Sequence, residues 1–487
     1  MDPLRILNEP VFLTLSRVAD TSGMEVYVIG GFVRDLMLGS PSKDIDILVI
    51  GDGVAFAGQV AAALKSRPKV TVYKTFGTAS LKYREDQEWD IEFVGARKES
   101  YTLSSRKPEV EAGTLADDQL RRDFTINAMA LGLNSDNYGH LLDPFGGLED
   151  LRLGIIRTPR DPFITFSDDP LRMMRAVRFA TRFGFSIHPE VFESIRQNAQ
   201  RLSIVSMERI IDELNKTIAC RIPSRGFNLM RDSGLLKEFF PEFEALAGTE
   251  YIDGKGHKDN FRHTLEVLDK LSQRTDNLWL RWAALLHDIA KPPTRRFDPA
   301  QGWTFHGHEH LGAKMVKTLF RRFKLPLNEK MEYVARLVQL HLRPIALVDE
   351  EVTDSAIRRL LFEAGELTED LMMLCEADIT SKNPEKVRRY LRNFEYVKQR
   401  MKDVETRDRV RNFQPPVSGE AIMEVFGIPP SYPVGVIKNT IKDAILDGMI
   451  RNDYDEAFTL MLETGKKNGL NPATDAEVCR EKFRIQP

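Results

Sequence analysis

Two aspartates spaced two apart, Asp44 and Asp46, stand at the start of an apolar run. In a β-strand such side chains point to the same side, so the pair can hold one divalent cation or two. A glycine pair, Gly30 and Gly31, follows another apolar run and precedes a predicted helix over 32–38. Glycine lets the backbone approach a phosphate, and a helix N-terminus offers free N–H groups. Carboxylates beside a phosphate cradle suggest phosphoryl or nucleotidyl transfer, whereas surface aspartates on an ordinary strand are the alternative.

A second charged string is RRDFTINAMAL, which covers Arg121–Leu131. Its two arginines suit contacts with phosphate, and Asp123 suits a sugar hydroxyl. The apolar remainder predicts a helix. The alternative is that the three polar residues only cap this helix. In the strand predicted over 89–94, Glu92 is a candidate third acid for the metal site, with a solvated strand edge as the alternative.

The segment 168–185 predicts one helix with arginines at spacings of 3, 3 and 4 on one face. Asp169 and Arg172 lie three apart, so their side chains can reach the same spot. A carboxylate accepts from an exocyclic amine and a guanidinium donates to a ring nitrogen, which complements C or A and mismatches U or G. A salt bridge on a solvated face is the alternative. The basic face consists of Arg172, Arg175, Arg178 and Arg182.

Together these strings resemble the polymerase-β-like tRNA nucleotidyltransferases, which include the CCA-adding enzymes and bacterial poly(A) polymerases. GGFVRD followed by DID, RRDFTINAMA, LDPFGGLEDL and DDPLRMMRA carry the resemblance. Residues 167–170 depart from it, since relatives more often have Glu-Asp-x before LRMMRA, but Asp169 and Arg172 stay in place. ERIIDELN resembles a further motif, in which we expect Arg209 and Glu213 to form an i,i+4 ion pair that stabilises the neck.

The resemblance implies template-independent addition of C, C and A to the 3′ end of tRNA from CTP and ATP. Asp44 and Asp46 would be catalytic and hold Mg²⁺, and Asp169 and Arg172 would select the base. A CC-adding or A-adding specialist remains an alternative within the same class. The nucleotide-binding residues that the resemblance implies are Gly30, Gly31, Arg34, Arg122, Asp123, Asn127, Asp169, Arg172, Arg175 and Arg178.

Histidines indicate a second candidate site, since seven of the nine lie between positions 257 and 341. The adjacent pair His287-Asp288 ends an apolar segment predicted as a helix and can chelate one cation. Imidazole and carboxylate ligands suit transition metals, which can generate hydroxide for phosphoester hydrolysis. The order His263, His287-Asp288, Asp378 resembles the HD phosphohydrolase superfamily. His308 and His341 match the extra histidines of its two-metal members, whereas His257, His306 and His310 receive no role.

This resemblance leaves two alternatives open. The HD site can bind a metal without much catalysis, or it can carry the main activity while the head only binds RNA.

The bulk properties frame these sites. A chain of 487 residues is expected to form three or four units. The net charge of −3 means that positive charge for a nucleic acid must be local. Three distant cysteines indicate a reduced compartment, and no signal-like or membrane-spanning stretch is found, so we expect a cytoplasmic protein without a membrane partner.

The expected fold class is an α+β nucleotidyltransferase head, a small mixed sheet with helices, followed by all-α domains. We expect residues 1–150 to form the head, 151–250 a nucleotide-selecting neck and body, 251–380 the HD domain and 381–487 a tRNA-binding tail. Residues 95–118 are expected to form a mobile basic loop that closes over a triphosphate. In the tail, a long helix over 382–411 carries eleven Lys or Arg against five Asp or Glu, and the chain beyond Gly469 is expected to be frayed.

Overall fold

The structure is a computed structural model that describes residues 3–40, 42–74, 77–84, 88–102, 105–252, 255–256, 258–349, 353–380, 383–408, 411, 414–473 and 475–484. The chain divides into two compact units, Met1–Ala245 and Leu246–Pro487. The expected class is confirmed, since a mixed sheet with helices is followed by a helix-rich remainder. In the part of the chain that is described, no helix is both long and apolar enough to cross a bilayer.

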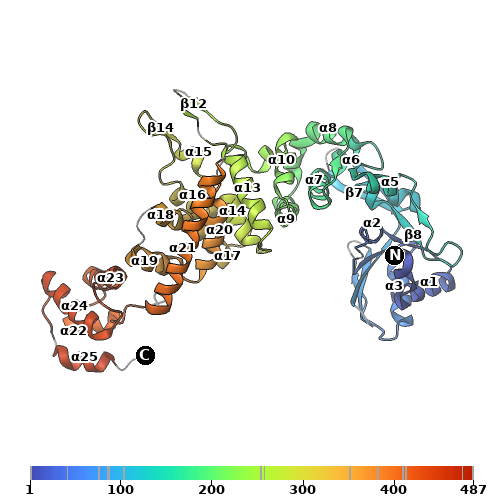
Figure 1. The fold of residues 1–487 in the computed structure, drawn as a ribbon. Helices are drawn as coiled ribbons and strands as arrows, with labels where there is room; N and C mark the ends of the chain where they lie inside the picture. Colours follow the sequence, from blue (N-terminus) through green and yellow to red (C-terminus); the bar gives the residue numbers. More distant parts are fainter. Residues whose placement is uncertain are drawn as a thin grey trace. The chain divides into compact units, whose positions relative to one another are not determined.

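The first unit contains one large sheet, which has seven strands within the described residues, in the order β3–β4–β5–β2–β1–β8–β9 (Figure 1). β2 and β5 run parallel, and the other neighbours run antiparallel. The strands are β1 (Glu25–Ile29), β2 (Asp44–Ile50), β3 (Thr71–Tyr73), β4 (Thr78–Arg84), β5 (Glu88–Gly95), β8 (Ala130–Gly132) and β9 (Leu141–Leu142).

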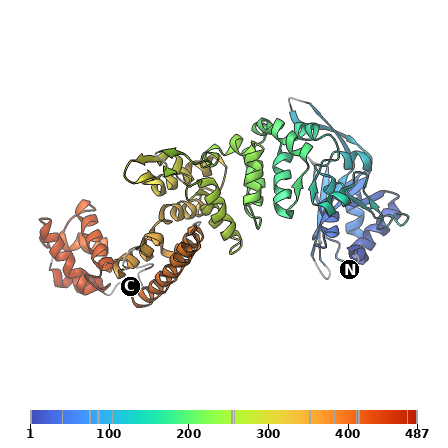
Figure 2. The same ribbon diagram turned by 45° about the horizontal axis from the view of Figure 1, so that its top comes forward.

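The two faces of this sheet differ, because the apolar side chains of β2 alternate with its aspartates. α1 (Pro10–Ser22) and α3 (Gly53–Ala63) pack on each other and on the sheet, and Figure 2 shows them beside it. Ile45 and Ile47 are buried, while Asp44 and Asp46 point to the opposite face. Between β1 and β2 lies α2 (Gly31–Met37), and a short 3-10 helix, η1 (Pro3–Asn8), precedes α1.

Two predictions in the head are wrong. Residues 95–118 do not form a loop, because β6 (Arg97–Thr102) and β7 (Ser105–Ala112) pair as an antiparallel hairpin, followed by α4 (Leu115–Leu120). The side chains of residues 98–110 lie outside the described residues, so the basic character expected there is not tested. The segment after Arg122 is not a helix either, since it forms a 3-10 turn, η2 (Thr125–Asn127), and then β8, which pairs with β1.

The neck is helical, and α7 begins directly after Pro170, so Asp168 and Asp169 precede the continuous helix expected within 168–185. Asp169 is extended, with φ −134° and ψ 97°, and separates α6 from α7. The reason is Pro170, whose ring disfavours helical backbone at the residue before it. The elements are α5 (Gly147–Leu153), β10 (Ile155–Ile156), α6 (Pro162–Asp168), α7 (Leu171–Phe183), β11 (Ser186–Ile187), α8 (Pro189–Asn198), η3 (Ala199–Ile204), α9 (Met207–Ile218), α10 (Ser224–Asp232), α11 (Leu235–Phe239) and α12 (Pro241–Glu244).

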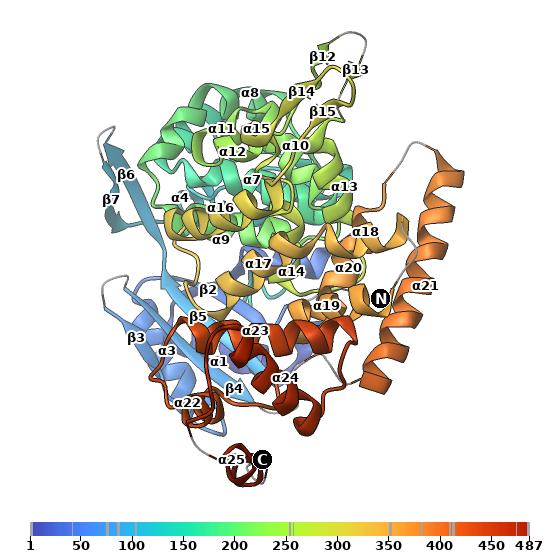
Figure 3. The ribbon, with the colours of Figure 1, turned by 90° about the vertical axis from the view of Figure 1, so that its left-hand side faces the viewer.

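The first part of the second unit contains helices and two small hairpins. The hairpins, β12–β13 and β14–β15, lie side by side (Figure 3). α13 packs on α14 and α20, and α14 packs on α17, which makes a buried helical core. The elements are β12 (Tyr251–Ile252), β13 (Lys255–Gly256), α13 (Asn260–Ser272), α14 (Leu278–Leu286), α15 (Lys291–Thr294), β14 (Arg296–Asp298), β15 (Gly302–Thr304), α16 (His308–Arg322), α17 (Glu329–Leu340), α18 (Arg343–Asp349), α19 (Asp354–Ala364), η4 (Gly365–Leu367) and α20 (Thr368–Asp378).

The tail of this unit is more ordered than expected. A helix, α25, follows Gly469 and packs on α22, with Cys479 buried and Lys482 paired with Glu424. The prediction of a frayed end is therefore wrong, because the apolar side chains of this amphipathic helix pack against α22. The elements are α21 (Pro384–Asp408), α22 (Gly419–Phe426), α23 (Tyr432–Asp447), α24 (Tyr454–Lys467) and α25 (Ala476–Arg484).

Candidate active site and candidate metal centre

The carboxylates of the head lie on one face of the sheet at the first residues of β2. The parallel register places Asp44 opposite Asp90 and Asp46 opposite Glu92, so these side chains share a face. Asp44 and Glu92 are exposed and Asp46 is half-buried. Burial raises the pKa of the Asp46 carboxyl to about 6, with Glu92 and Asp44 adding to the rise and Arg122 opposing it. A cation here would relieve the repulsion between these acids.

Gly30 sits against this acidic group in a way that only glycine permits. Its φ of +81° is in the left-handed region. A Cβ at this position would lie 2.8 Å from Nη1 of Arg122 and 3.3 Å from Oδ2 of Asp46. Gly31 is less constrained, because its Cβ would make only an ordinary contact with Arg34, at 3.6 Å. Gly30 therefore brings the backbone beside both the Asp46 carboxylate and the Arg122 guanidinium.

Arg122 connects the carboxylates with a pocket of about 280 Å³. Its Nε donates to Oδ2 of Asp118 at 3.0 Å, and Asp118 is completely buried. This support holds the guanidinium between Gly30 and the pocket. The pocket is lined by Arg121, Arg122, Asp123, Asp169, Leu171, Arg172, Arg175 and Arg209.

Asp169 and Arg172 both line the pocket, although they do not share a helix. Nη2 of Arg172 donates to the carbonyl oxygen of Arg121 at 2.7 Å. The Arg172 residue is only 8% exposed, and among the described residues its Nη1 has no hydrogen-bond partner. Oδ1 of Asp169 accepts from the backbone N–H of Leu171 at 3.2 Å. A fixed guanidinium with one unused nitrogen, beside a carboxylate, fits the Watson–Crick edge of a base.

Other predicted nucleotide-binding residues form a chain that ties the head to the neck. Nη1 of Arg34 donates to Oδ1 of Asn127 at 2.6 Å, and Nδ2 of Asn127 donates to Oδ1 of Asp123 at 3.0 Å. Arg175 then donates to Oδ2 of Asp123 at 2.7 Å. Although burial acts in the opposite direction, Arg175 and these hydrogen bonds lower the pKa of Asp123 to about 2. Arg34 is buried, with its guanidinium over the ring of Phe179, so it contributes to the packing of the head against the neck.

Glu213 has different partners from those that the sequence predicts. It is buried in α9 and forms ion pairs with Arg178 and, at 3.9 Å, with Arg175. Arg178 is buried as well, with its guanidinium over the ring of Phe179. The predicted i,i+4 pair of Arg209 with Glu213 is therefore wrong, because two arginines of α7 occupy the glutamate. Arg178 does not line the pocket.

The second unit brings the predicted HD residues together in two groups of potential ligand atoms, each within 4.8 Å of one another. The first group is His263, His287 and Asp378, and the second is Asp288, His308 and His341. Oδ2 of Asp288 lies 3.3 Å from Nε2 of His287, while its Oδ1 lies 3.5 Å from Nε2 of His308. The Asp288 carboxylate therefore faces both groups. Asp44, Asp46 and Glu92 do not form such a group.

Three of these histidines are held in the same orientation. Nδ1 of His287, His308 and His341 each lies 2.7 Å from a backbone carbonyl oxygen three residues earlier. This contact places the proton on Nδ1 and directs the Nε2 lone pair inward. Among the described residues, these three Nε2 atoms are buried without a hydrogen-bond partner. Buried, unpartnered imidazole nitrogens beside carboxylates are what a divalent metal site requires.

His263 is held differently, because it lies inside a helix. Its Nδ1 lies 2.8 Å from Nζ of Lys258 and 3.0 Å from Oγ1 of Thr380. Lys291, whose Nζ lies 2.6 Å from Oδ2 of Asp288, is a further neighbour that sequence reasoning missed. The sequence signal for this contact was the position of Lys291 three residues after Asp288, a spacing at which the two side chains can form an ion pair. His306 and His310 are exposed and outside both groups, and His257 lies outside the described residues.

Comparison with known proteins identifies the domains in which the two candidate sites lie. Three family models match the chain: a poly A polymerase head domain at residues 26–157, a probable RNA- and SrmB-binding site of polymerase A at 184–246, and an HD domain at 260–383. A multifunctional CCA protein of Nitrosococcus oceani is 34% identical over 370 residues, which cover 73% of this chain and 84% of that protein.

An A-adding tRNA nucleotidyltransferase of Deinococcus radiodurans is 31% identical over 86% of this chain and 90% of its own length. The chain belongs to the CCA-adding tRNA nucleotidyltransferase family. Among solved structures, a CCA-adding enzyme in complex with ATP has a TM-score of 0.62 and 25% identity, and the match covers 96% of each chain.

Family membership makes the chain a tRNA nucleotidyltransferase with a fused HD domain, and both parts imply dependence on divalent metal. Of the two classes of activity considered from the sequence, transfer by the head is therefore favoured over an HD hydrolase with an RNA-binding head.

Proposed function

We propose that this enzyme adds C, C and A to the 3′ end of tRNA, using CTP and ATP and releasing pyrophosphate. The observation that carries the proposal is the pocket in which Arg122 links Asp46 to the pair Asp169–Arg172. The multifunctional CCA protein at 34% identity and the ATP complex of a CCA-adding enzyme support the choice of substrates.

Asp44 and Asp46 are proposed to hold Mg²⁺, with Glu92 as the neighbouring acid. Mg²⁺ held there would supply activation of the 3′ hydroxyl of the tRNA and charge stabilisation for the leaving pyrophosphate. Arg122, fixed by Asp118, contacts the triphosphate beside the backbone of Gly30 and Gly31. Asp123 and Asn127 position the ribose only indirectly, since the Asp123 carboxylate already accepts from Arg175 and Asn127.

Base selection falls to a remaining acceptor site on the Asp169 carboxylate and to Nη1 of Arg172. Nη1 of Arg172 donates to the ring nitrogen of C or A, and a carboxylate oxygen of Asp169 accepts from the exocyclic amine. Uracil and guanine present a carbonyl and a ring N–H at these places, so they leave the buried guanidinium unpaired.

The test is a tRNA lacking its 3′ CCA, incubated with labelled CTP and ATP, separately and together, with product length read on a gel. Addition of CCA is expected. Addition of A only to a tRNA that already ends in CC would identify the specialist that the Deinococcus radiodurans relative is named for. The absence of incorporation at any Mg²⁺ concentration would overturn the proposal.

A second function is proposed for the HD centre, as a phosphohydrolase with a divalent transition metal. Asp288 faces both ligand groups, so these six side chains would hold the metal, which would supply a hydroxide for phosphoester hydrolysis. Hydrolysis of p-nitrophenyl phosphate by the full chain loaded with Ni²⁺, and its loss in His287→Asn, is the test. Activity that persists in that variant would exclude the centre.

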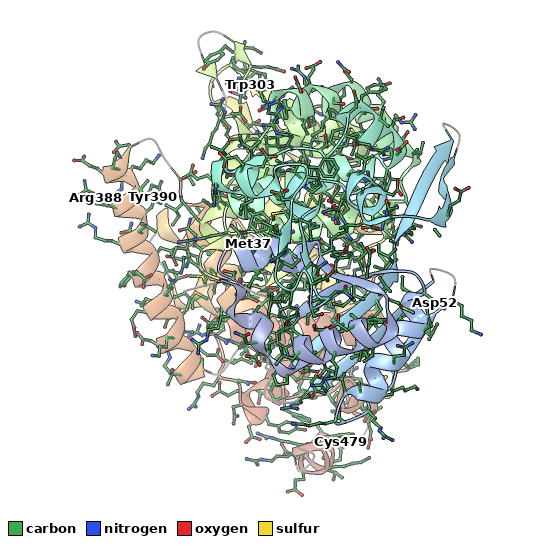
Figure 4. All side chains as sticks on the ribbon, turned by 90° about the vertical axis from the view of Figure 1, so that its right-hand side faces the viewer. Met37, Asp52, Trp303, Arg388, Tyr390 and Cys479 are labelled. Carbon is green, nitrogen blue, oxygen red and sulfur yellow. The ribbon has the colours of Figure 1, made fainter. Side chains whose placement is uncertain are left out.

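The tail is proposed to bind tRNA through the first half of α21. A groove of about 880 Å³ there is lined by four basic side chains and one acidic one, and Figure 4 shows Arg388 and Tyr390 near this end of the helix. Phe394 is buried and does not take part. Replacing the four bases with glutamine should weaken tRNA binding and flatten its salt dependence. They are Lys386, Arg388, Arg389 and Arg392.

A further inference from the structure

Arg209 is the one arginine of the pocket whose partner the sequence misassigns. It lies in the first turn of α9, and its side chain is 42% exposed. Glu213, the expected partner, is occupied by Arg178 and Arg175. Nη2 of Arg209 instead lies 3.4 Å from Oδ2 of Asp169. Arg209 is therefore available to the nucleotide pocket rather than to the helical neck.

The two members of the base-selecting pair are held by different means. Arg172 is buried, and a backbone carbonyl fixes its guanidinium. The Asp169 carboxylate stands on an extended residue between two helices, where the Leu171 N–H of its own segment donates to Oδ1. The other oxygen is held from α9, by Arg209. Without Arg209, the carboxylate can rotate about its side-chain torsions while Arg172 stays in place.

We propose that Arg209 is a positioning residue for base selection, which holds the Asp169 carboxylate with a lone pair directed at the exocyclic amine of C or A. This inference rests on the proposed role of Asp169 and Arg172. Each carboxylate oxygen has two acceptor sites, so Oδ2 can accept from Arg209 and from a base amine at once. A fixed carboxylate also repels the carbonyl oxygen that uracil or guanine presents at that place, and this repulsion is the source of discrimination.

Arg209 could instead bind the triphosphate, since the pocket has five arginines and two aspartates. The triphosphate contact and the positioning of Asp169 have different effects on the discrimination between nucleotides. A phosphate contact serves all four nucleotides equally, because they share the triphosphate. A contact that orients Asp169 affects correct and incorrect bases in opposite directions.

The experiment compares kcat/KM for CTP and UTP on a tRNA lacking CCA, and for ATP and GTP on a tRNA ending in CC, using the full chain. The variants are Arg209→Met, Arg209→Lys and, as a matched control, Arg196→Met. Arg196 is an exposed arginine of α8 that pairs with Glu193 at 3.9 Å, remote from the pocket lining. Thermal unfolding of each variant shows whether the fold is retained.

Arg209→Met should lower the preference for CTP over UTP by about tenfold, the scale of one lost positioning contact. Arg209→Lys should restore most of it, and Arg196→Met should keep the wild-type ratio. In an Asp169→Asn background, Arg209→Met should add no further loss. An equal loss for all four nucleotides, or an unchanged ratio, would overturn the inference. If the wild-type enzyme itself incorporates neither C nor A, the proposed function fails instead, and the two failures are therefore distinguishable.

Discussion

The two proposed metal sites of this chain differ in how far their side chains would enclose an ion. In the HD centre, His287 and His341 are completely buried and Asp288 is 1% exposed, so six side chains enclose the site. In the head, Asp44 is exposed at the start of a strand, and within the described part of the chain no third ligand completes a compact group with Asp44 and Asp46. A site that transfers a nucleotide to RNA must leave coordination positions for both substrates, whereas an enclosed site supplies most ligands itself.

The largest expected effect separates the two sites completely. Asp44→Asn should lower CCA addition by about a thousandfold or more, because it removes a ligand of the ion that activates the 3′ hydroxyl. Extension of a labelled tRNA measures this. Hydrolysis at the HD centre should remain within twofold of wild type, and comparable loss of both activities would contradict the separation.

The reciprocal change is Asp288→Asn, which alters the carboxylate that faces both groups in the HD centre. It should lower Ni²⁺ affinity by about a hundredfold, at the upper end of effects seen for groups that support metal ligands. Competition with a chromophoric chelator measures the affinity. If CCA addition falls in parallel, the two centres are coupled and do not act separately.

The pH dependence of metal binding should also differ. Because burial raises the pKa of Asp46 to about 6, protons compete with Mg²⁺ or Mn²⁺ below that pH. Affinity should therefore be nearly constant above pH 7 and should fall about tenfold for each unit below pH 6, as expected for one competing proton. Mn²⁺ binding followed by electron paramagnetic resonance, in the Asp288→Asn variant, isolates the head. An affinity that is flat down to pH 5 would refute the assignment.

A further expected difference is in the stability that each ion confers. Ni²⁺ at a hundred times its dissociation constant should stabilise the unit that contains the HD centre by about 2.7 kcal/mol, because the ion binds only the folded ligand set. Calorimetry of the full chain measures it. Mg²⁺ at the same free concentration should change the unfolding temperature much less, and equal stabilisation by the two ions would remove the distinction between enclosed and open sites.

The sequence by itself determined the chemistry of both sites. Asp44 and Asp46 two apart predict a shared face on a strand, and they share one. His263, His287-Asp288 and Asp378 predict a metal site, and their ligand atoms come together with those of His308 and His341. The strand period and the adjacent pair fix the geometry of Asp44–Asp46 and of His287-Asp288 locally, whereas His263 and Asp378 join His287 only through the packing of α13, α14 and α20.

Only the tertiary structure decided which polar residues serve the site and which serve the fold. Arg34, Asn127 and Arg178 have the residue types of a nucleotide site, yet they join the head to the neck or pack within it. Arg209 changes its partner from Glu213 to Asp169. The physical reason is that a long charged side chain can reach several partners. Which carboxylate it pairs with depends on which arginines the packing of α7 on α9 places beside each carboxylate.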